Sequence, residues 1–332
     1  MAGHCTVSMV RLARRALLAS AVAGALALGT APLAQAEVKG LEIIAPAGPG
    51  GGWDQTARAM QTALQEAGLA SGVQVQNIAG AGGTIGLAQF VTSKKKKGDA
   101  LLVGGLVMEG AILTNKAPVG LSDVTPLARL TGEYELVVVP ADSPIQTMAD
   151  LVAKLKSDPG AVSWGGGSTG GTDHILAGLI AKAAGVDASK VNYIAHSGGG
   201  EALASILGGH VTAGISGYEE FAPQIEAGKL KALAISSEER LPNVAVPTLK
   251  EQGLDVSLVN WRGVFAPPQI RDKDKAALAK AIEQMTQSPQ WQETLAKRGW
   301  MNLYQNAEQF QAFLVEDQKK IAETLKQIGL TQ

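Results

Sequence analysis

The sequence predicts an α/β protein made of two lobes that are joined by two extended crossing segments. A short apolar strand, a glycine-rich turn and a helix follow one another repeatedly, which is typical of parallel βαβ units. Two extended apolar stretches, residues 126–139 and 256–266, are long enough to leave one sheet and enter another. Residues 37–332, which follow a predicted leader, are also enough for two α/β domains of ordinary size.

Residues 1–36 have the features of a secretory signal peptide. Arg11, Arg14 and Arg15 precede a stretch rich in Ala and Leu that carries no charge, and Ala34-Gln35-Ala36 fits the small-residue cleavage pattern. We therefore predict export and cleavage after Ala36. An uncleaved membrane anchor is the weaker alternative, because the stretch is poor in bulky residues and ends in a cleavage pattern.

Composition restricts the function of the exported part. The sole cysteine, Cys5, lies in the leader, so no disulfide is expected after cleavage. The chain has 29 basic and 30 acidic residues; the leader removes three arginines and no acid, which leaves 26 against 30 and a net charge of −4. This balance argues against a nucleic-acid partner. No His, Cys or carboxylate cluster has metal-ligand spacing, so neither a metal nor a cofactor is expected.

Residues 41–60 contain a strand, a glycine turn and the start of a helix, the order of elements around which the chain is organised. Residues 41–45 predict a buried strand, glycines at 48 and 50–52 predict a turn, and Asp54 is the expected N-cap of a helix that ends near Gly68. The first turn of a helix leaves backbone N–H groups without partners and carries partial positive charge. Glycines let an anion approach those donors, so this segment predicts anion binding by backbone.

The same order recurs at residues 72–89, 161–183 and 190–207. A single glycine turn would be interpreted as a short βα connection, but the recurrence favours ligand binding. In open α/β sheets, ligands bind at the carboxyl ends of the strands, where these turns lie. If both lobes present those ends to one cleft, their helix N-termini converge there.

The remaining elements follow from periodicity and turn residues. The first lobe is predicted to contain residues 37–135 and 262–332, and the second lobe residues 136–261. The run Lys94–Lys97 is interpreted as solvated loop surface. Strands are predicted at 41–45, 73–78, 101–107, 161–164, 211–215 and 230–235, and helices at 54–67, 83–92, 219–227, 272–286 and 307–328, the last with a cap at Asn306 and Gln309.

Two enzyme motifs occur in the third glycine turn. Residues 166–170 match G-x-S-x-G with Ser168 as the nucleophile, and His174, His196 or His210 would be the base. A secreted serine hydrolase is therefore kept as the alternative from another functional class. Residues 165–170 also match a dinucleotide fingerprint, which is disfavoured in the middle of an exported chain. Because short patterns arise easily in glycine tracts, we predict that the protein is not an enzyme.

Several side chains have two interpretations. We expect Asp54 to cap a helix rather than to contact the ligand. We expect His174 to take part in a cap or to line the cleft rather than to act in catalysis. Trp53 is expected either to line the cleft or to pack at the hinge. Tyr218 has a similar choice of positions, and we expect it to line the cleft. Arg262, on the second crossing segment, either binds a ligand carboxylate in a bidentate manner or forms a salt bridge at the hinge.

Taken together, the motifs resemble one receptor family over essentially all of residues 37–332. They are APAGPGGGWDQTARAM, NIAGAGGTIGLAQF, WGGGSTGGTDH, GGGEALASILGGHVTAGISGYEEF and NWRGVFAPP. In this order they are similar to the periplasmic substrate-binding proteins of tripartite tricarboxylate transporters, the TctC or Bug-type receptors.

This resemblance implies a two-lobe periplasmic-binding-protein fold of type II-like arrangement, with a ligand cleft between the lobes. It implies a monomeric periplasmic receptor that closes around a small organic carboxylate and delivers it to a two-component membrane permease. GGGWDQTAR resembles the citrate-type members, so a tricarboxylate is the first expectation; few basic residues lie near the turns, and a C4-dicarboxylate stays open. The ligand-binding residues implied, with Arg262 added, are Gly50, Gly51, Gly52, Trp53, Asp54, Gly80, Ala81, Gly82, Gly83, Thr84, Gly167, Ser168, Thr169, Gly170, Gly171, Thr172, His174, Ser197, Gly198, Gly199, Gly200, Ser216, Gly217 and Tyr218.

Overall fold

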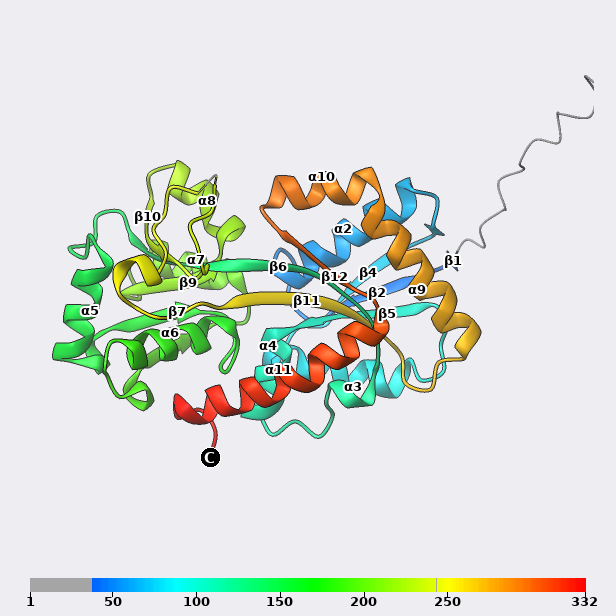
Figure 1. Ribbon diagram of the computed structural model, residues 1–332, viewed down its shortest axis with the longest axis horizontal. Helices are drawn as coiled ribbons and strands as arrows, with labels where there is room; N and C mark the ends of the chain where they lie inside the picture. Colours follow the sequence, from blue (N-terminus) through cyan, green and yellow to red (C-terminus); the bar gives the residue numbers. More distant parts are fainter. Residues whose placement is uncertain (1–37, 243) are drawn as a thin grey trace, which may run out of the picture. The chain divides into compact units, whose positions relative to one another are not determined.

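A computed structural model describes residues 38–242 and 244–332 (Figure 1). The predicted signal peptide and its cleavage site lie outside the described residues. The described part is a mixed α/β structure, as predicted, and none of its helices is both long and apolar enough to cross a bilayer. Its strands form one large mixed sheet and a small two-stranded one.

The first part of the chain builds a parallel sheet in which β2 (Glu42–Ala45) lies between β4 (Gln74–Asn77) and β5 (Ala100–Gly105). The helices that follow these strands are α2 (Gly52–Glu66), α3 (Thr84–Ser93) and α4 (Leu106–Thr114), with a 3₁₀ turn η1 (Ala81–Gly83) before α3. The small sheet pairs β1 (Val38–Lys39) with β3 (Ala70–Ser71). We call the elements that pack on β2, β4 and β5 the first lobe.

The second part of the chain repeats this design around β7 (Ser163–Gly166), which pairs in parallel with β8 (Asn192–Ala195) and β9 (Ala213–Gly217). The other elements are α5 (Met148–Ser157), α6 (Thr172–Ala183), α7 (Gly199–Leu207), α8 (Tyr218–Glu226) and β10 (Leu230–Ile235). Their apolar side chains form cores separate from that of the first lobe, around Trp164 and Phe221. We call these elements the second lobe.

Two long strands belong to both lobes, as the extended apolar stretches predict. β6 (Thr125–Pro140) pairs with β11 (Val259–Ala266) and β12 (Met301–Gln305) along its first part, and with β9 and β10 along its last part. β11 also pairs with β5 in antiparallel orientation. The order of the large sheet is therefore β4-β2-β5-β11-β6-β9-β7-β8, and Figure 1 shows β6 and β11 running between the two groups of elements.

The C-terminal segment returns to the first lobe. It contains α9 (Asp272–Gln287), α10 (Pro289–Arg298), β12 and α11 (Ala307–Gln327). The predicted cap of α11 is confirmed: Asn306 accepts a hydrogen bond from the Gln309 N–H, and the Gln309 side chain accepts one from the Asn306 N–H. The short 3₁₀ turns elsewhere are η2 (Leu121–Asp123), η3 (Pro159–Ala161), η4 (Ala188–Lys190) and η5 (Lys250–Gln252).

Helices α4 and α10 and strand β12 are absent from the sequence prediction, as are the two-residue strands β1 and β3. α4 is apolar on nearly every face because it packs between α11, α3, β11 and the turn before α6, so it has no amphipathic period. α10 and β12 were also missed, although Ser288 and Pro289 are a helix-start signal. Helix α2 begins at Gly52 with Gly51 as its N-cap, not at Asp54.

Candidate functional site

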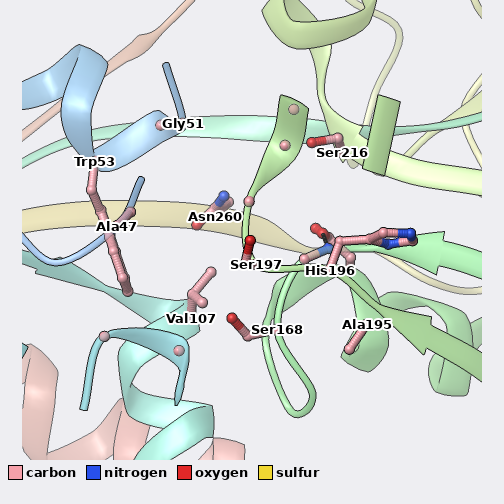
Figure 2. Close-up of a pocket in the computed structure, with 18 of the residues that line it drawn as sticks. Ala47, Gly51, Trp53, Val107, Ser168, Ala195, His196, Ser197, Ser216 and Asn260 are labelled. Atoms are coloured by element: carbon pink, nitrogen blue, oxygen red, sulfur yellow. Dashed lines mark hydrogen bonds between the residues drawn. The ribbon is translucent and has the colours of Figure 1, made fainter. Parts of the chain in front are cut away.

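The glycine turns of both lobes line one cavity of about 330 Å³ (Figure 2). Figure 2 shows Gly51 and Trp53 of the first lobe on one side and His196, Ser197 and Ser216 of the second lobe on the other. Asn260 of β11 lies between them. The volume is at the small end of the range for ligand sites, which suits a compact molecule.

Most of the predicted site residues line this cavity, and the rest are not among its lining residues. Those that line it are Gly51, Gly52, Trp53, Gly80, Ala81, Gly82, Gly83, Gly167, Ser168, Thr169, Ser197, Gly198, Gly199, Ser216, Gly217 and Arg262. The lining does not include Gly50, Asp54, Thr84, Gly170, Gly171, Thr172, His174, Gly200 and Tyr218.

Asp54 stabilises the turn before α2 through hydrogen bonds and does not itself line the cavity. Its carboxylate accepts hydrogen bonds from the Gly50 N–H and the Asn77 amide, each at 2.9 Å, and forms an ion pair with Arg58. Burial tends to raise the pKa of Asp54, but the hydrogen bonds from Arg58, Gly50 and Asn77 outweigh it and lower the pKa. The expected N-cap role is therefore corrected: Asp54 shapes the loop that leads into the helix.

The turn at residues 80–84 has a backbone that favours glycine. Gly80, Gly82 and Gly83 have φ values of 130°, 62° and 87°, and Ala81 has 48°. The Asn115 amide donates to the Ala81 carbonyl at 3.1 Å. A side chain at Gly83 would collide with the Trp53 ring, so the absence of a Cβ lets the indole pack on this turn.

This turn also keeps free donors on the cavity wall. The Gly83 N–H donates to the Gly80 carbonyl, but the N–H groups of Ala81 and Gly82 have no acceptor among the described residues. The first turn of α3 contains no acidic residue, in contrast to the first turns of α2, α6, α7 and α8. The positive end of the α3 dipole is therefore not compensated by its own helix.

The other glycine turns direct part of their donors to acids of the protein. The Gly167 N–H donates to Asp173 at 2.6 Å, and the Ser197 N–H donates to Glu201 at 3.1 Å. In the first turn, the Gly50 N–H donates to Asp54. In each of these three turns, a carboxylate of the protein therefore already accepts a backbone N–H. The four turns are thus unequal as anion sites, a difference that strand-turn-helix patterns do not reveal.

His174 supports the third turn rather than lining the cavity. Its Nδ1 accepts a hydrogen bond from the Gly170 N–H at 3.3 Å, and its ring stacks on Tyr193 with centroids 4.1 Å apart. Burial lowers the pKa of His174 to about 4, so the ring is neutral at pH 7. Thr172, beside it at the start of α6, is completely buried.

A group of four carboxylates is the main feature of the site that the sequence analysis missed. We call Glu133, Glu135, Asp173 and Glu220, all of which line the cavity, the acidic wall. Glu133 forms a buried ion pair with Arg262, which is 3% exposed and packs where a side chain at Gly52 would lie. Arg262 therefore forms a structural ion pair, one of its two predicted roles, and also lines the cavity; its binding of a ligand carboxylate stays a prediction.

The remaining acids of the wall have fewer partners. Glu220 accepts a hydrogen bond from the Ser216 hydroxyl. Glu135 is 0% exposed, and neither of its carboxylate oxygens has a hydrogen-bond partner among the described residues. A buried acceptor without a partner is costly in a folded protein, so Glu135 stands out at this site.

Burial and mutual repulsion raise the pKa values of these acids. The pKa of Glu135 is raised well above its usual range by burial and then by Asp173, Glu133 and Glu220, against an opposing effect of Arg262. Burial raises the pKa of Asp173 to about 7, although the Gly167 N–H opposes the rise. Burial and Glu133 raise the pKa of Glu220, while the Ser216 hydroxyl and the Gly52 backbone oppose it.

A signal for this wall was present in the sequence. Glu133 and Glu135 alternate within GEYELVVV, a stretch that is otherwise apolar and forms the shared strand β6. Charged residues are rare inside a buried strand, and their presence here is explained by the cavity that they line. Val107, Asn115, His196 and Asn260 also line the cavity and carry no comparable signal.

Ser168 lines the cavity without the hydrogen bond of a hydrolytic nucleophile. Within the described part of the chain, no hydrogen bond joins the Ser168 hydroxyl to a histidine. His196 Nδ1 lies 3.0 Å from the Gly166 carbonyl oxygen, and His174 Nδ1 is engaged with Gly170. The geometry therefore lacks the nucleophile–base contact that a serine hydrolase uses.

Comparisons with known proteins agree with this architecture. A family model described as "Tripartite tricarboxylate transporter family receptor" matches residues 56–330. A UPF0065 protein in the gbd 5′ region of Cupriavidus necator is 32% identical over 80% of this chain and 80% of its own length. Protein BugT of Bordetella pertussis is 30% identical over 87% of this chain and 89% of its own length.

Solved structures share the fold at lower identity. The periplasmic binding protein BugD superposes with a TM-score of 0.80 at 23% identity, over 88% of this chain and 98% of its own. MatC from Rhodopseudomonas palustris, which holds malate, has a TM-score of 0.76 at 24% identity, over 88% and 99% of the two chains. An R. palustris protein with adipate has a TM-score of 0.80 at 21% identity, over 88% and 97%.

Proposed function

Because the chain belongs to the family of tripartite tricarboxylate transporter receptors, we propose that it is an exported, non-catalytic receptor for a small organic carboxylate. The predicted signal peptide would place it in the periplasm as a monomer, where it would deliver its ligand to a two-component membrane permease. Residues 37–135 with 262–332, and residues 136–261, would move as the two lobes.

The observation that carries this proposal is the turn at residues 80–84. The N–H groups of Ala81 and Gly82 are free, α3 adds the positive end of its dipole, and the cavity wall has no acid from that helix. A carboxylate bound there would receive hydrogen bonds from the backbone and could also be reached by the Ser168 hydroxyl. We call this region of the cavity the donor turn.

The two shared strands suggest how the cavity would close. β6 and β11 are the long connections between the lobes, and strands that connect two lobes commonly act as hinges around a ligand. The donor turn lies in the first lobe, whereas Ser168 and Thr169 lie in the second. Closure would therefore bring hydroxyl groups of one lobe to an anion held by the other.

The charged residues that line the cavity bear on the net charge of the anion that it would bind. Citrate remains a candidate from the GGGWDQTAR segment, but a trianion would face the acidic wall with Arg262 already paired to Glu133. Two structures of the same fold hold malate and adipate, which supports testing dicarboxylates beside citrate. We therefore propose a carboxylate of low net negative charge in place of a tricarboxylate.

The proposal is tested by thermal shift and calorimetry of the secreted protein with citrate, tricarballylate, succinate, malate, adipate and glutamate. A selective rise in melting temperature without turnover of the ligand is expected, since a ligand at 100 times its Kd adds about 2.7 kcal/mol of stability. Val107→Glu should abolish that rise by placing a negative charge beside Ser168, and Val107→Gln should retain most of it. Equal binding by both variants would contradict a carboxylate at the donor turn.

A further inference from the structure

The cavity is lined by two groups of residues of opposite electrical character. The donor turn offers N–H groups and a helix N-terminus, and the acidic wall offers Glu135 and Glu220 next to the paired Glu133. We infer that the ligand carries a cationic nitrogen group as well as its carboxylate, and that Glu135 of the acidic wall binds this group. The inference rests on the proposed function, because it specifies the class of carboxylate that the receptor takes.

Glu135 is the residue that points to a missing partner. It lies on β6 opposite Gly217 of β9, belongs to the residues that line the cavity and is 0% exposed, and neither of its buried carboxylate oxygens has a hydrogen-bond partner among the described residues. The other acids of the site have donors: Glu133 has Arg262, Asp173 has the Gly167 N–H, and Glu220 has the Ser216 hydroxyl. A ligand ammonium would give Glu135 the charged hydrogen bonds that the described residues do not provide.

The cations near the cavity do not fill this need. Arg262 is the only Lys or Arg among the residues that line the cavity, and it is paired with Glu133. Arg298 of α10 is paired with Glu219 of α8 and donates to Gln55. A ligand cation would therefore add the positive charge that the acidic wall lacks, whereas a second ligand carboxylate would add to the repulsion.

A protonated Glu135 is the competing explanation. A neutral carboxyl group at this position would donate a hydrogen bond to a ligand oxygen, and a plain dicarboxylate would then bind with uptake of a proton. This arrangement requires no cationic group on the ligand. The two explanations therefore differ in whether the ligand's amino group improves or weakens binding.

Isothermal titration at pH 7 with matched ligand pairs distinguishes them. The pairs are succinate and aspartate, glutarate and glutamate, and butyrate and 4-aminobutyrate, each measured with the protein secreted from the full chain. We expect the amino member of at least one pair to bind at least tenfold more tightly than its partner. We also expect Glu135→Gln to reduce this preference at least tenfold while raising or preserving the melting temperature, because it removes a buried acid.

Glu226→Gln is the matched control, since Glu226 is an exposed acid on α8 outside the cavity lining. It should leave the preference unchanged. Tighter binding of the plain acids, with proton uptake in buffers of different ionisation heat, would overturn the inference and leave the carboxylate receptor intact. An amino preference that survives in Glu135→Gln would also overturn it. Failure of every acid, with or without an amino group, would overturn the proposed function itself.

Discussion

The guanidinium of Arg298 on α10 lies 3.1 Å from the carboxylate of Glu219 on α8, so an ion pair joins the C-terminal segment to the second lobe. The same Nη1 atom donates to the Gln55 side chain of α2 at 2.6 Å. Since α10 packs on α2, this contact spans the two lobes beside the cavity without belonging to its lining. It is a candidate for a contact that favours closure.

We expect Arg298→Met and Glu219→Gln each to weaken affinity for the bound carboxylate by at most about fivefold. The limit follows from partial exposure, because pairs of this kind contribute roughly 0–1 kcal/mol. The two effects should be less than additive in the double variant, and they should shrink as salt is raised. Calorimetry of the four proteins at low and high salt checks this. Additive effects that do not change with salt would contradict a direct ion-pair contribution to closure.

Much of the architecture could be predicted because it depends on local patterns. Glycine turns, short apolar strands and the Asn306–Gln309 cap depend on residues that are close together in the sequence. The long strands β6 and β11 are recognisable as extended, mainly apolar stretches despite the charged residues within them. α4 was missed for the opposite reason: tertiary contacts on all of its faces remove the period that marks a helix.

The balance of charge in the cavity could not be predicted in the same way. The sequence locates the glycine turns but does not tell which donors are already bonded, and the pairing of Gly167 with Asp173 appears only in three dimensions. The acidic wall combines residues of β6, α6 and α8, which are far apart in the chain. Arg262 was noticed, but its partner Glu133 lies 129 positions away.

Glu109 of α4 is expected to make stability depend on pH. It is 2% exposed, neither oxygen has a partner among the described residues, and burial together with Asp317 raises its pKa to about 9. The folded protein therefore keeps a proton that the unfolded chain releases above its ordinary pKa of 4.5, so this residue lowers stability progressively as pH rises from 4.5 towards 9.

Glu109→Gln should remove that loss. The variant is expected to match the wild type near pH 5 and to exceed it by roughly 1–3 kcal/mol at pH 8, which is the usual scale for an unsatisfied buried group. Chemical denaturation at the two pH values measures the difference. Glu323→Gln, an exposed change on α11, serves as the control. A gain of equal size at both pH values would show that the ionisation of Glu109 is not the cause.

Asp54 should matter for the shape of the first glycine turn. Its carboxylate holds the Gly50 N–H, Arg58 and Asn77, so Asp54→Ala is expected to cost roughly 1–3 kcal/mol of stability and to weaken ligand binding. Because the folded pKa of Asp54 is lowered, its contribution is present above the unfolded pKa of 3.8 and is lost as pH falls below it. The cost of the substitution should therefore be smaller near pH 3 than at pH 7, as measured by denaturation; an equal cost would contradict a charged role.

Valine substitutions at Gly51 and Gly82 separate obstruction of the cavity from damage to the fold. Gly51 has φ −76°, and a Cβ there would meet no atom closer than 3.7 Å, so Gly51→Val should lose less than about 1 kcal/mol of stability. Gly82 has φ 62°, and a Cβ there would collide with Ala111. The left-handed backbone alone costs about 1–2 kcal/mol for a residue with a side chain, so Gly82→Val should lower stability more.

Both valine variants should bind the carboxylate more weakly, but only Gly51→Val allows a clear conclusion, because its fold is expected to stay intact. Calorimetry should show a loss of affinity with an unchanged melting temperature in the absence of ligand. The loss should be smaller than that of Val107→Glu if the donor turn, rather than the turn before α2, holds the carboxylate. A larger loss at Gly51 would move the anion to the N-terminus of α2, where Glu220 now faces the Gly52 backbone.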